Sequence, residues 1–150
     1  MEYIKKVGVS GFIYLGTLIL AIVGFAIYMA TTGTPYFVSY GVDPLVVTMA
    51  ILTIIVCLAE IALPVFLPKL DYVALVLKVA ICVFLMIGLC EVLLVRLYNI
   101  PTLLTFENNP ANNALAIQCI VGIVFYLLAI VAAVAGAFFK TTAEEPVAAK

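Results

Sequence analysis

Two side chains of opposite charge, Glu60 and Lys78, stand inside long apolar runs of this sequence. Glu60 precedes Lys69 by nine positions, and Lys78 follows Lys69 by nine. An α-helix rises about 1.5 Å per residue, so two antiparallel helices that turn near Lys69 would hold the acid and the base at equal depth, roughly 13 Å from the turn. A charge at such depth in a membrane costs about 2.5–3.5 kcal/mol, and pairing offsets much of that cost. We therefore predict an intramembrane ion pair between Glu60 and Lys78.

Two further features accompany the predicted pair. Pro64 would leave the Glu60 carbonyl without its helical hydrogen bond, so the Lys78 ammonium could serve both this carbonyl and the carboxylate. Cys57 and Cys82 flank the same turn at nearly matched depth. A hairpin that pairs Glu60 with Lys78 would also bring these two thiols near each other.

Glu91 is a third ionisable residue in these runs, and it does not share a helix face with Lys78. It follows Lys78 by 13 positions, which corresponds to about 220° around a helix and roughly 20 Å along it. Arg96, 18 positions past Lys78, returns to the Lys78 face. The alternatives for Glu91 are interior packing or snorkelling, a contact with a partner, and an ion pathway. We select Glu91 and Arg96 as candidates for a contact with a partner or an ion.

The elements that carry these side chains are predicted to be membrane spans. Of the 150 residues, 67% are hydrophobic and 10% are charged, whereas a soluble domain has about 25% charged residues. Four segments reach the roughly 20 residues that a helix needs to cross the hydrocarbon core. They are residues 7–29, 45–66, 72–98 and 114–139. We predict an all-α integral membrane protein with one antiparallel four-helix bundle over residues 1–140, and a disordered cytoplasmic tail over residues 141–150.

Lysine and arginine residues outside the spans predict the orientation, because such residues gather on the cytoplasmic side. With the N-terminus inside, only Arg96 would lie on the outer side. The cytoplasmic side would hold five lysines: Lys5, Lys6, Lys69, Lys140 and Lys150. We expect a multi-pass protein of the plasma (inner) membrane with both termini in the cytoplasm.

In this orientation residues 30–44 and 99–113 would form two outer loops. Four aromatic residues in or beside them would join an interfacial aromatic belt: Tyr36, Phe37, Tyr40 and Tyr98. The second loop contains Asn109-Pro110-Ala111, the tripeptide that aquaporins use twice. Here it occurs once, and we interpret it as a turn and helix start, with Asn112 or Asn113 as the cap of the last span.

Small and polar residues recur in three spans with the 3.5-residue period of left-handed helix bundles. In the first span they are Ser10, Tyr14, Thr17, Ala21, Gly24 and Tyr28; in the second they are Ala50, Thr53, Cys57, Glu60 and Pro64. In the fourth span they are Gln118, Gly122, Phe125, Ala129, Ala132 and Gly136. From these we assign helix packing to Thr17, Ala21, Gly24, Gly122, Ala129 and Gly136. Packing within one bundle is the expectation, and packing against another chain is the alternative.

The residue types argue against an enzyme. The chain has no histidine, the commonest general base and metal ligand, and none of its four cysteines forms a Cys-x-x-C motif. We expect no catalytic residue, no metal and no cofactor, and the net charge of −1 gives no sign of a nucleic-acid partner. The Trp and Cys signature of claudins and the Cys-Cys-Gly of tetraspanins are absent, and we assign no family.

The predicted function is that of a small non-catalytic subunit or scaffold in the lipid bilayer. It would bind a membrane protein partner, or another copy of itself, through its outer loops or helix faces. The alternative is an oligomeric channel or transporter subunit for ions or small solutes, with Glu60, Lys78 and Glu91 in the pathway, because ionisable residues inside a membrane often mark such pathways.

Overall fold

The computed structural model describes residues 8–66, 71–107 and 109–139, and over these ranges the chain forms helices and no strand. The helices are α2 (Val9–Thr32), α3 (Pro44–Phe66), α4 (Asp71–Thr105) and α5 (Pro110–Ala137). Each contains a stretch long and apolar enough to cross a membrane. The prediction of four apolar helices in an all-α protein is confirmed, while the predicted tail, residues 141–150, lies outside the described residues.

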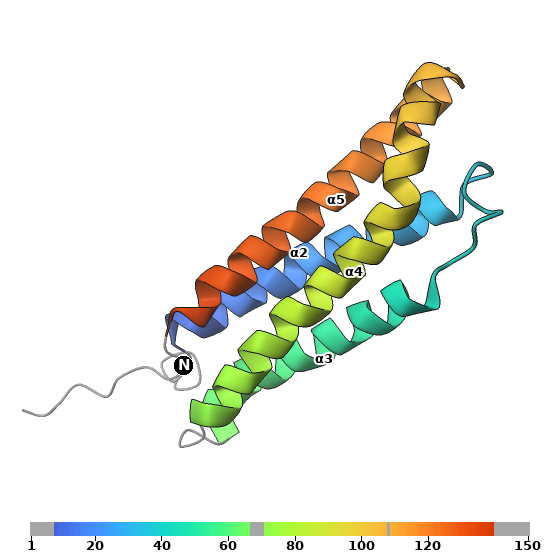
Figure 1. Ribbon diagram of the computed structural model, residues 1–150. Helices are drawn as coiled ribbons and strands as arrows, with labels where there is room; N and C mark the ends of the chain where they lie inside the picture. The colour runs from blue at the N-terminus through green and yellow to red at the C-terminus, as the bar shows by residue number, and fades with distance from the viewer. Residues whose placement is uncertain (1–7, 67–70, 108, 140–150) are drawn as a thin grey trace, which may run out of the picture.

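The four helices lie side by side as an antiparallel bundle in which each helix packs against two others (Figure 1). Helix α2 contacts α3 and α5, and α4 contacts the same two helices. We call the end where α2 begins and α5 ends the Lys78 end, and the opposite end the Arg96 end.

Glycines let α2 and α5 approach closely. A Cβ on Gly24 would lie 3.0 Å from a ring carbon of Tyr126 and 3.5 Å from the Gly122 carbonyl oxygen. A Cβ on Gly122 would in turn lie 3.0 Å from a methyl carbon of Ile27. Small residues at such a contact allow the dispersion interactions on which helix association in lipid depends.

Two polar side chains of α2 add hydrogen bonds to the same contact. The Ser10 hydroxyl donates to the Gly136 carbonyl over 3.1 Å, and the Tyr14 hydroxyl donates to the Ala133 carbonyl over 3.0 Å. Both acceptors lie in the last turns of α5, and the Gly136 carbonyl also accepts a hydrogen bond from the Phe139 backbone N–H over 3.2 Å. The start of α2 is thereby fastened to the end of α5.

The residues that we assigned to helix packing are all buried: Thr17, Ala21, Gly24, Gly122, Ala129 and Gly136. The rest of the stripe predicted for the last span is displaced by one position. The buried face of α5 contains Cys119, Tyr126 and Ala133, whereas the stripe had contained their neighbours Gln118, Phe125 and Ala132. The reason is that the exposed Gln118 turns outward and the ring of Tyr126 fills the space opposite Gly24.

Helix α4 continues to Thr105, seven positions past the boundary predicted at Tyr98. Pro101 lies inside this extension and cannot donate a backbone hydrogen bond, which weakens a helix without ending it when neighbouring groups compensate. The carbonyl that Pro101 leaves without its helical donor is that of Leu97, and the helix nevertheless continues to Thr105. Most of the predicted second outer loop is therefore helix.

Helix α5 begins at Pro110, which confirms that the Asn-Pro-Ala motif starts a helix. Its cap is Asn109, whose side-chain oxygen accepts a hydrogen bond from the Asn112 backbone N–H over 2.8 Å. The assignment of the cap to Asn112 or Asn113 was wrong, because proline at the first helical position requires the capping residue just before it.

Candidate functional site

At the Lys78 end, the structure brings Glu60 of α3 and Lys78 of α4 together. The Lys78 Nζ lies 3.9 Å from the Glu60 Oε1, and Glu60 is fully buried. The antiparallel pairing of α3 with α4 and the equal distance of both residues from the turn produce this contact. Across the residues that the structure describes, it is the only salt bridge.

The Lys78 ammonium also donates a hydrogen bond of 2.6 Å to the Phe139 carbonyl, just past the end of α5. The sequence had suggested the Glu60 carbonyl as its second acceptor, through Pro64, whose side chain lies outside the described part. The observed acceptor is a carbonyl at a helix C-terminus, where the helix dipole favours a cation. The pair therefore lies at the level where α5 ends, close to the end of the bundle.

Two thiols and a tyrosine surround this pair. Cys57 and Tyr14 are fully buried, and Glu60 and Cys82 lie within electrostatic range of both. All four cysteines of the chain are free thiols. Within the described ranges no cluster of three potential metal ligands occurs, so this group consists of one ion pair with weakly polar neighbours.

Apolar side chains fill the bundle between its two ends. Ile81, Leu85 and Leu89 are buried along the inner face of α4, one turn after another. Two cavities beside Tyr126 have volumes of about 10 Å³ each, and a single water needs roughly 10–15 Å³. The middle of the bundle is thus a packed core rather than a wide passage.

At the Arg96 end, the Arg96 residue is 2% exposed. One of its nitrogens, Nη2, donates to the Thr32 hydroxyl over 2.6 Å and to the Thr31 hydroxyl over 3.1 Å. The guanidinium carbon lies 3.6 Å from the centre of the Phe37 ring and 5.4 Å from the centre of the Tyr28 ring. Among the described residues, hydroxyl oxygens and ring faces, and no carboxylate, hold this cation.

The connection between α2 and α3 closes over Arg96. Phe37 is fully buried, and its ring also packs in a cluster with Leu103 and Leu115. The Tyr36 and Tyr40 hydroxyls donate to the Asn99 side-chain oxygen over 3.3 and 3.2 Å. The placement of Phe37 in an interfacial belt was therefore wrong, because the ring is needed inside the protein as a partner for the arginine.

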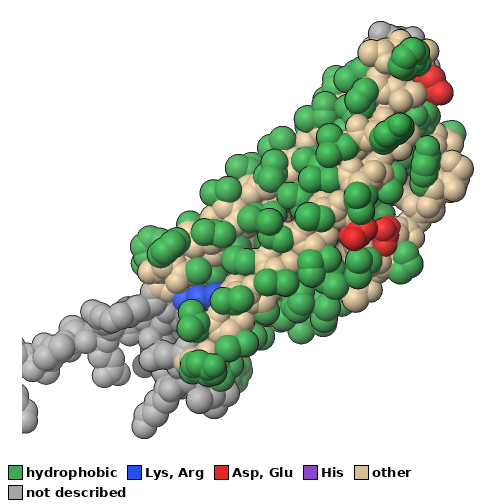
Figure 2. Space-filling model, viewed as in Figure 1, with side chains coloured by type: hydrophobic (Ala, Val, Ile, Leu, Met, Phe, Trp, Pro, Cys, Tyr) green, Lys and Arg blue, Asp and Glu red, His purple; other side chains and the backbone are tan. Residues whose placement is uncertain are grey.

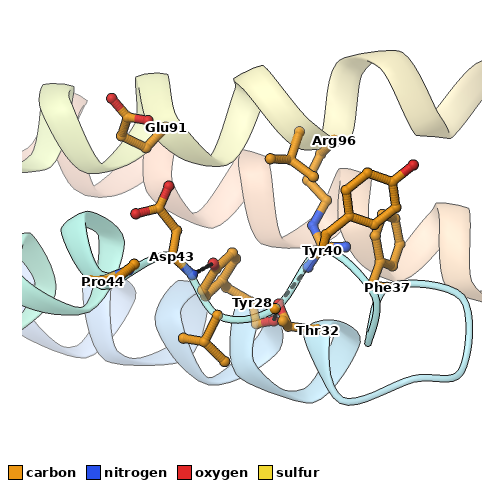
Figure 3. A pocket seen from close by; sticks show the side chains of 11 residues that line it. Tyr28, Thr32, Phe37, Tyr40, Asp43, Pro44, Glu91 and Arg96 are labelled. Carbon is orange, nitrogen blue, oxygen red and sulfur yellow. Dashed lines mark hydrogen bonds between the residues drawn. The ribbon is translucent and has the colours of Figure 1, made fainter.

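Between this connection and α4 lies a pocket of about 250 Å³ (Figure 3). Its polar lining contains Glu91 and Arg96, the two sequence candidates, together with Asp43, Tyr28, Thr32 and Tyr40. Figure 3 shows Asp43 and Glu91 toward one end of the pocket and Arg96 toward the other. The pocket therefore carries opposite charges at its two ends.

Sequence reasoning missed Asp43, which it took only as punctuation between spans. Its Oδ1 accepts a hydrogen bond from the Leu45 backbone N–H over 2.7 Å and so caps α3, and its own backbone N–H donates to the Tyr28 hydroxyl over 3.0 Å. The signal was available, because Asp followed by Pro is typical of a helix start. The capping geometry places this carboxylate on the pocket wall.

Comparison with models of protein families, with curated proteins and with solved structures found no match to this chain.

Proposed function

We propose that the protein is a multi-pass protein of the plasma (inner) membrane with both termini in the cytoplasm, and that it acts as a non-catalytic subunit or scaffold. The exterior supports insertion in lipid. Hydrophobic side chains cover most of the face in Figure 2, and charged groups are confined to small patches. The lysines on which the orientation depends lie outside the described residues, so the orientation rests on the charge pattern of the sequence.

The spacing of the two buried cations of α4 supports a membrane position for the bundle. Lys78 and Arg96 are 18 positions apart, which corresponds to about 27 Å along a helix. The hydrocarbon core of a bilayer is about 30 Å thick. In this position each cation would lie near one boundary of the hydrocarbon, where a charge costs less than at the centre of the bilayer.

The observation that carries the proposal is the outer extension of α4. The helix has 35 residues, about 52 Å, and residues 97–105 would extend about 14 Å beyond Arg96. In Figure 1 the α4–α5 turn reaches further along the bundle axis than the connection between α2 and α3. This tip presents Tyr98 and Phe106, which are 86% and 89% exposed. Aromatic side chains are enriched where proteins bind one another, so the tip is the proposed contact with a membrane protein partner or a second copy of this chain.

The test is purification from the native membrane in mild detergent, followed by the mass of the complex and its components. The double variant Tyr98→Ser and Phe106→Ser should lose the second polypeptide, or the second copy, at unchanged thermal stability. Phe138→Ser is the matched control, because Phe138 is 85% exposed at the opposite end. Recovery of the same complex from the double variant would refute the tip as the contact.

The second candidate, an oligomeric channel or transporter subunit, is favoured by the burial of Glu60 and Lys78. A pathway would have to run between several copies, because the middle of one bundle is packed. Purified protein in liposomes distinguishes the two proposals. Ion flux that Glu60→Gln abolishes would support transport, and no flux above that of empty liposomes is expected for a scaffold.

A further inference from the structure

We propose that the pocket between α4 and the α2–α3 connection binds a phosphoethanolamine group, with its phosphate toward Arg96 and its ammonium between Asp43 and Glu91. The pocket supplies a buried cation at one end and two carboxylates at the other (Figure 3). A ligand that carries one negative and one positive charge, separated by a short linker, matches both ends.

The first step concerns Arg96, whose charge is incompletely compensated inside the protein. Its Nη1 is buried and has no hydrogen-bond partner, and no carboxylate lies within 4.0 Å of the guanidinium among the described residues. A buried donor without a partner is costly, and a buried charge without a counter-charge is more so. An anion in the pocket that Arg96 lines would supply the missing negative charge, and phosphate suits a guanidinium well.

The second step concerns the opposite end, which rejects a simple anion. Asp43 and Glu91 both line the pocket, and neither forms a salt bridge within the described ranges. Two carboxylates beside a bound phosphate would repel it, whereas an ammonium between them would be attracted to both. A primary ammonium has three N–H donors, enough to reach both carboxylates and a further acceptor.

The size and the walls of the pocket fit the same group. A volume of about 250 Å³ lies just below the roughly 300–1,000 Å³ of pockets for drug-sized molecules, so a ligand of a few heavy atoms is expected. The rings of Tyr28 and Tyr40 belong to the lining, and aromatic faces attract ammonium groups.

A phosphoethanolamine group could come from a phospholipid headgroup or from a free metabolite. The proposed membrane position favours the lipid, because it sets Arg96 near the boundary of the hydrocarbon, where headgroups begin. Val42 lines the pocket, and Leu45 and Leu94 lie close to pocket residues in sequence. The exposed apolar side chains of these three residues could contact acyl chains.

The experiment is thermal unfolding of the purified full chain in an uncharged detergent, followed by circular dichroism. Two probes carry the proposed group: dihexanoyl phosphatidylethanolamine and free O-phosphoethanolamine. Two more carry the anion alone: dihexanoyl phosphatidic acid and inorganic phosphate. We expect dihexanoyl phosphatidylethanolamine to raise the unfolding midpoint in a saturable way. Dihexanoyl phosphatidic acid and inorganic phosphate should raise it little. A rise with free O-phosphoethanolamine of equal size would assign the ligand to the soluble source.

Variants of the two ends give the sharper test. Glu91→Gln should weaken binding of the lipid probe by about tenfold or more, the loss of one charge-assisted hydrogen bond. Asp43→Asn should weaken it similarly while keeping the cap of α3, since asparagine also caps helices. Glu107→Gln is the matched control, because Glu107 is exposed at the same end and does not line the pocket.

Three results would overturn the proposal. One is the absence of a saturable shift with either probe that carries the ammonium. Another is a shift with phosphatidic acid equal to that with phosphatidylethanolamine, which would mean that Asp43 and Glu91 do not contribute to ligand binding. The third is a Glu91→Gln variant that binds the lipid probe as tightly as the Glu107→Gln control does.

Discussion

Substituting either Glu60 or Lys78 should show how much their ion pair contributes to the free energy of unfolding. At 3.9 Å and an effective dielectric constant of 20, two unit charges attract each other by about 4 kcal/mol. Lys78→Met would remove this attraction together with the hydrogen bond to the Phe139 carbonyl, which as a charged bond contributes about 1.5–3 kcal/mol. The residual Glu60 carboxyl can take up a proton, which recovers part of the loss. We therefore expect each single variant, Lys78→Met or Glu60→Gln, to lower the free energy of unfolding by about 2–4 kcal/mol.

The double variant carries the decisive information. If the two charges compensate each other, Glu60→Gln with Lys78→Met should be more stable than the sum of the single effects by at least about 1 kcal/mol, because it leaves no uncompensated charge. The assay is reversible unfolding in mixed micelles with increasing dodecyl sulfate, followed by circular dichroism. Additive single effects, with no coupling energy beyond the error of the measurement, would refute the pairing.

Three further perturbations test the packing and the second cation. Gly24→Ala should destabilise the bundle by about 1–3 kcal/mol in the same assay, because the new Cβ meets the Tyr126 ring at 3.0 Å. Gly16→Ala is its control: nothing lies within 4 Å of the new Cβ, so this variant should be neutral or stabilising by up to about 1 kcal/mol. Arg96→Lys should cost about 1–2 kcal/mol, since an ammonium cannot both stack on an aromatic ring and reach two hydroxyls, and an unchanged midpoint would contradict that account. In a variant without the other two cysteines, a thiol reagent should modify the half-buried Cys82 well before the fully buried Cys57, as measured by mass spectrometry; equal rates would contradict the packing around Cys57.

The long-range partners of Glu60 and Lys78 divide into those that the sequence could predict and those that it could not. Their mutual contact follows from one short turn and the fixed rise of a helix, so counting residues was enough. The hydrogen bond from Lys78 to the Phe139 carbonyl joins α4 to α5. It depends on where α5 ends and how far it leans toward α4, and no periodicity within one segment contains that information.

At the Arg96 end the sequence identified the two charged residues but not their surroundings. Helical spacing separated Glu91 from the Lys78 face and returned Arg96 to it. The pocket that they line is closed by the connection between α2 and α3, whose path is set by the stacking of Phe37 on Arg96 and by the hydrogen bonds of two tyrosines to Asn99. A loop aromatic can face lipid or protein equally well by composition, so the choice is made by tertiary contacts alone.

The two cations of α4 differ in how the protein compensates them, and this difference supports the proposed ligand site at the Arg96 end. Lys78 has a carboxylate of α3 3.9 Å away and, just past the end of α5, the Phe139 carbonyl 2.6 Å away. Arg96 has two hydroxyls and two ring faces, retains a buried Nη1 without a hydrogen-bond partner, and borders a pocket with acids at its far end. A cation with an internal counter-charge stabilises the fold and gains little from outside. A cation held only by dipoles and rings gains from an external anion, so ligands should act at the Arg96 end, and variants of the Lys78 end should alter stability without altering ligand affinity.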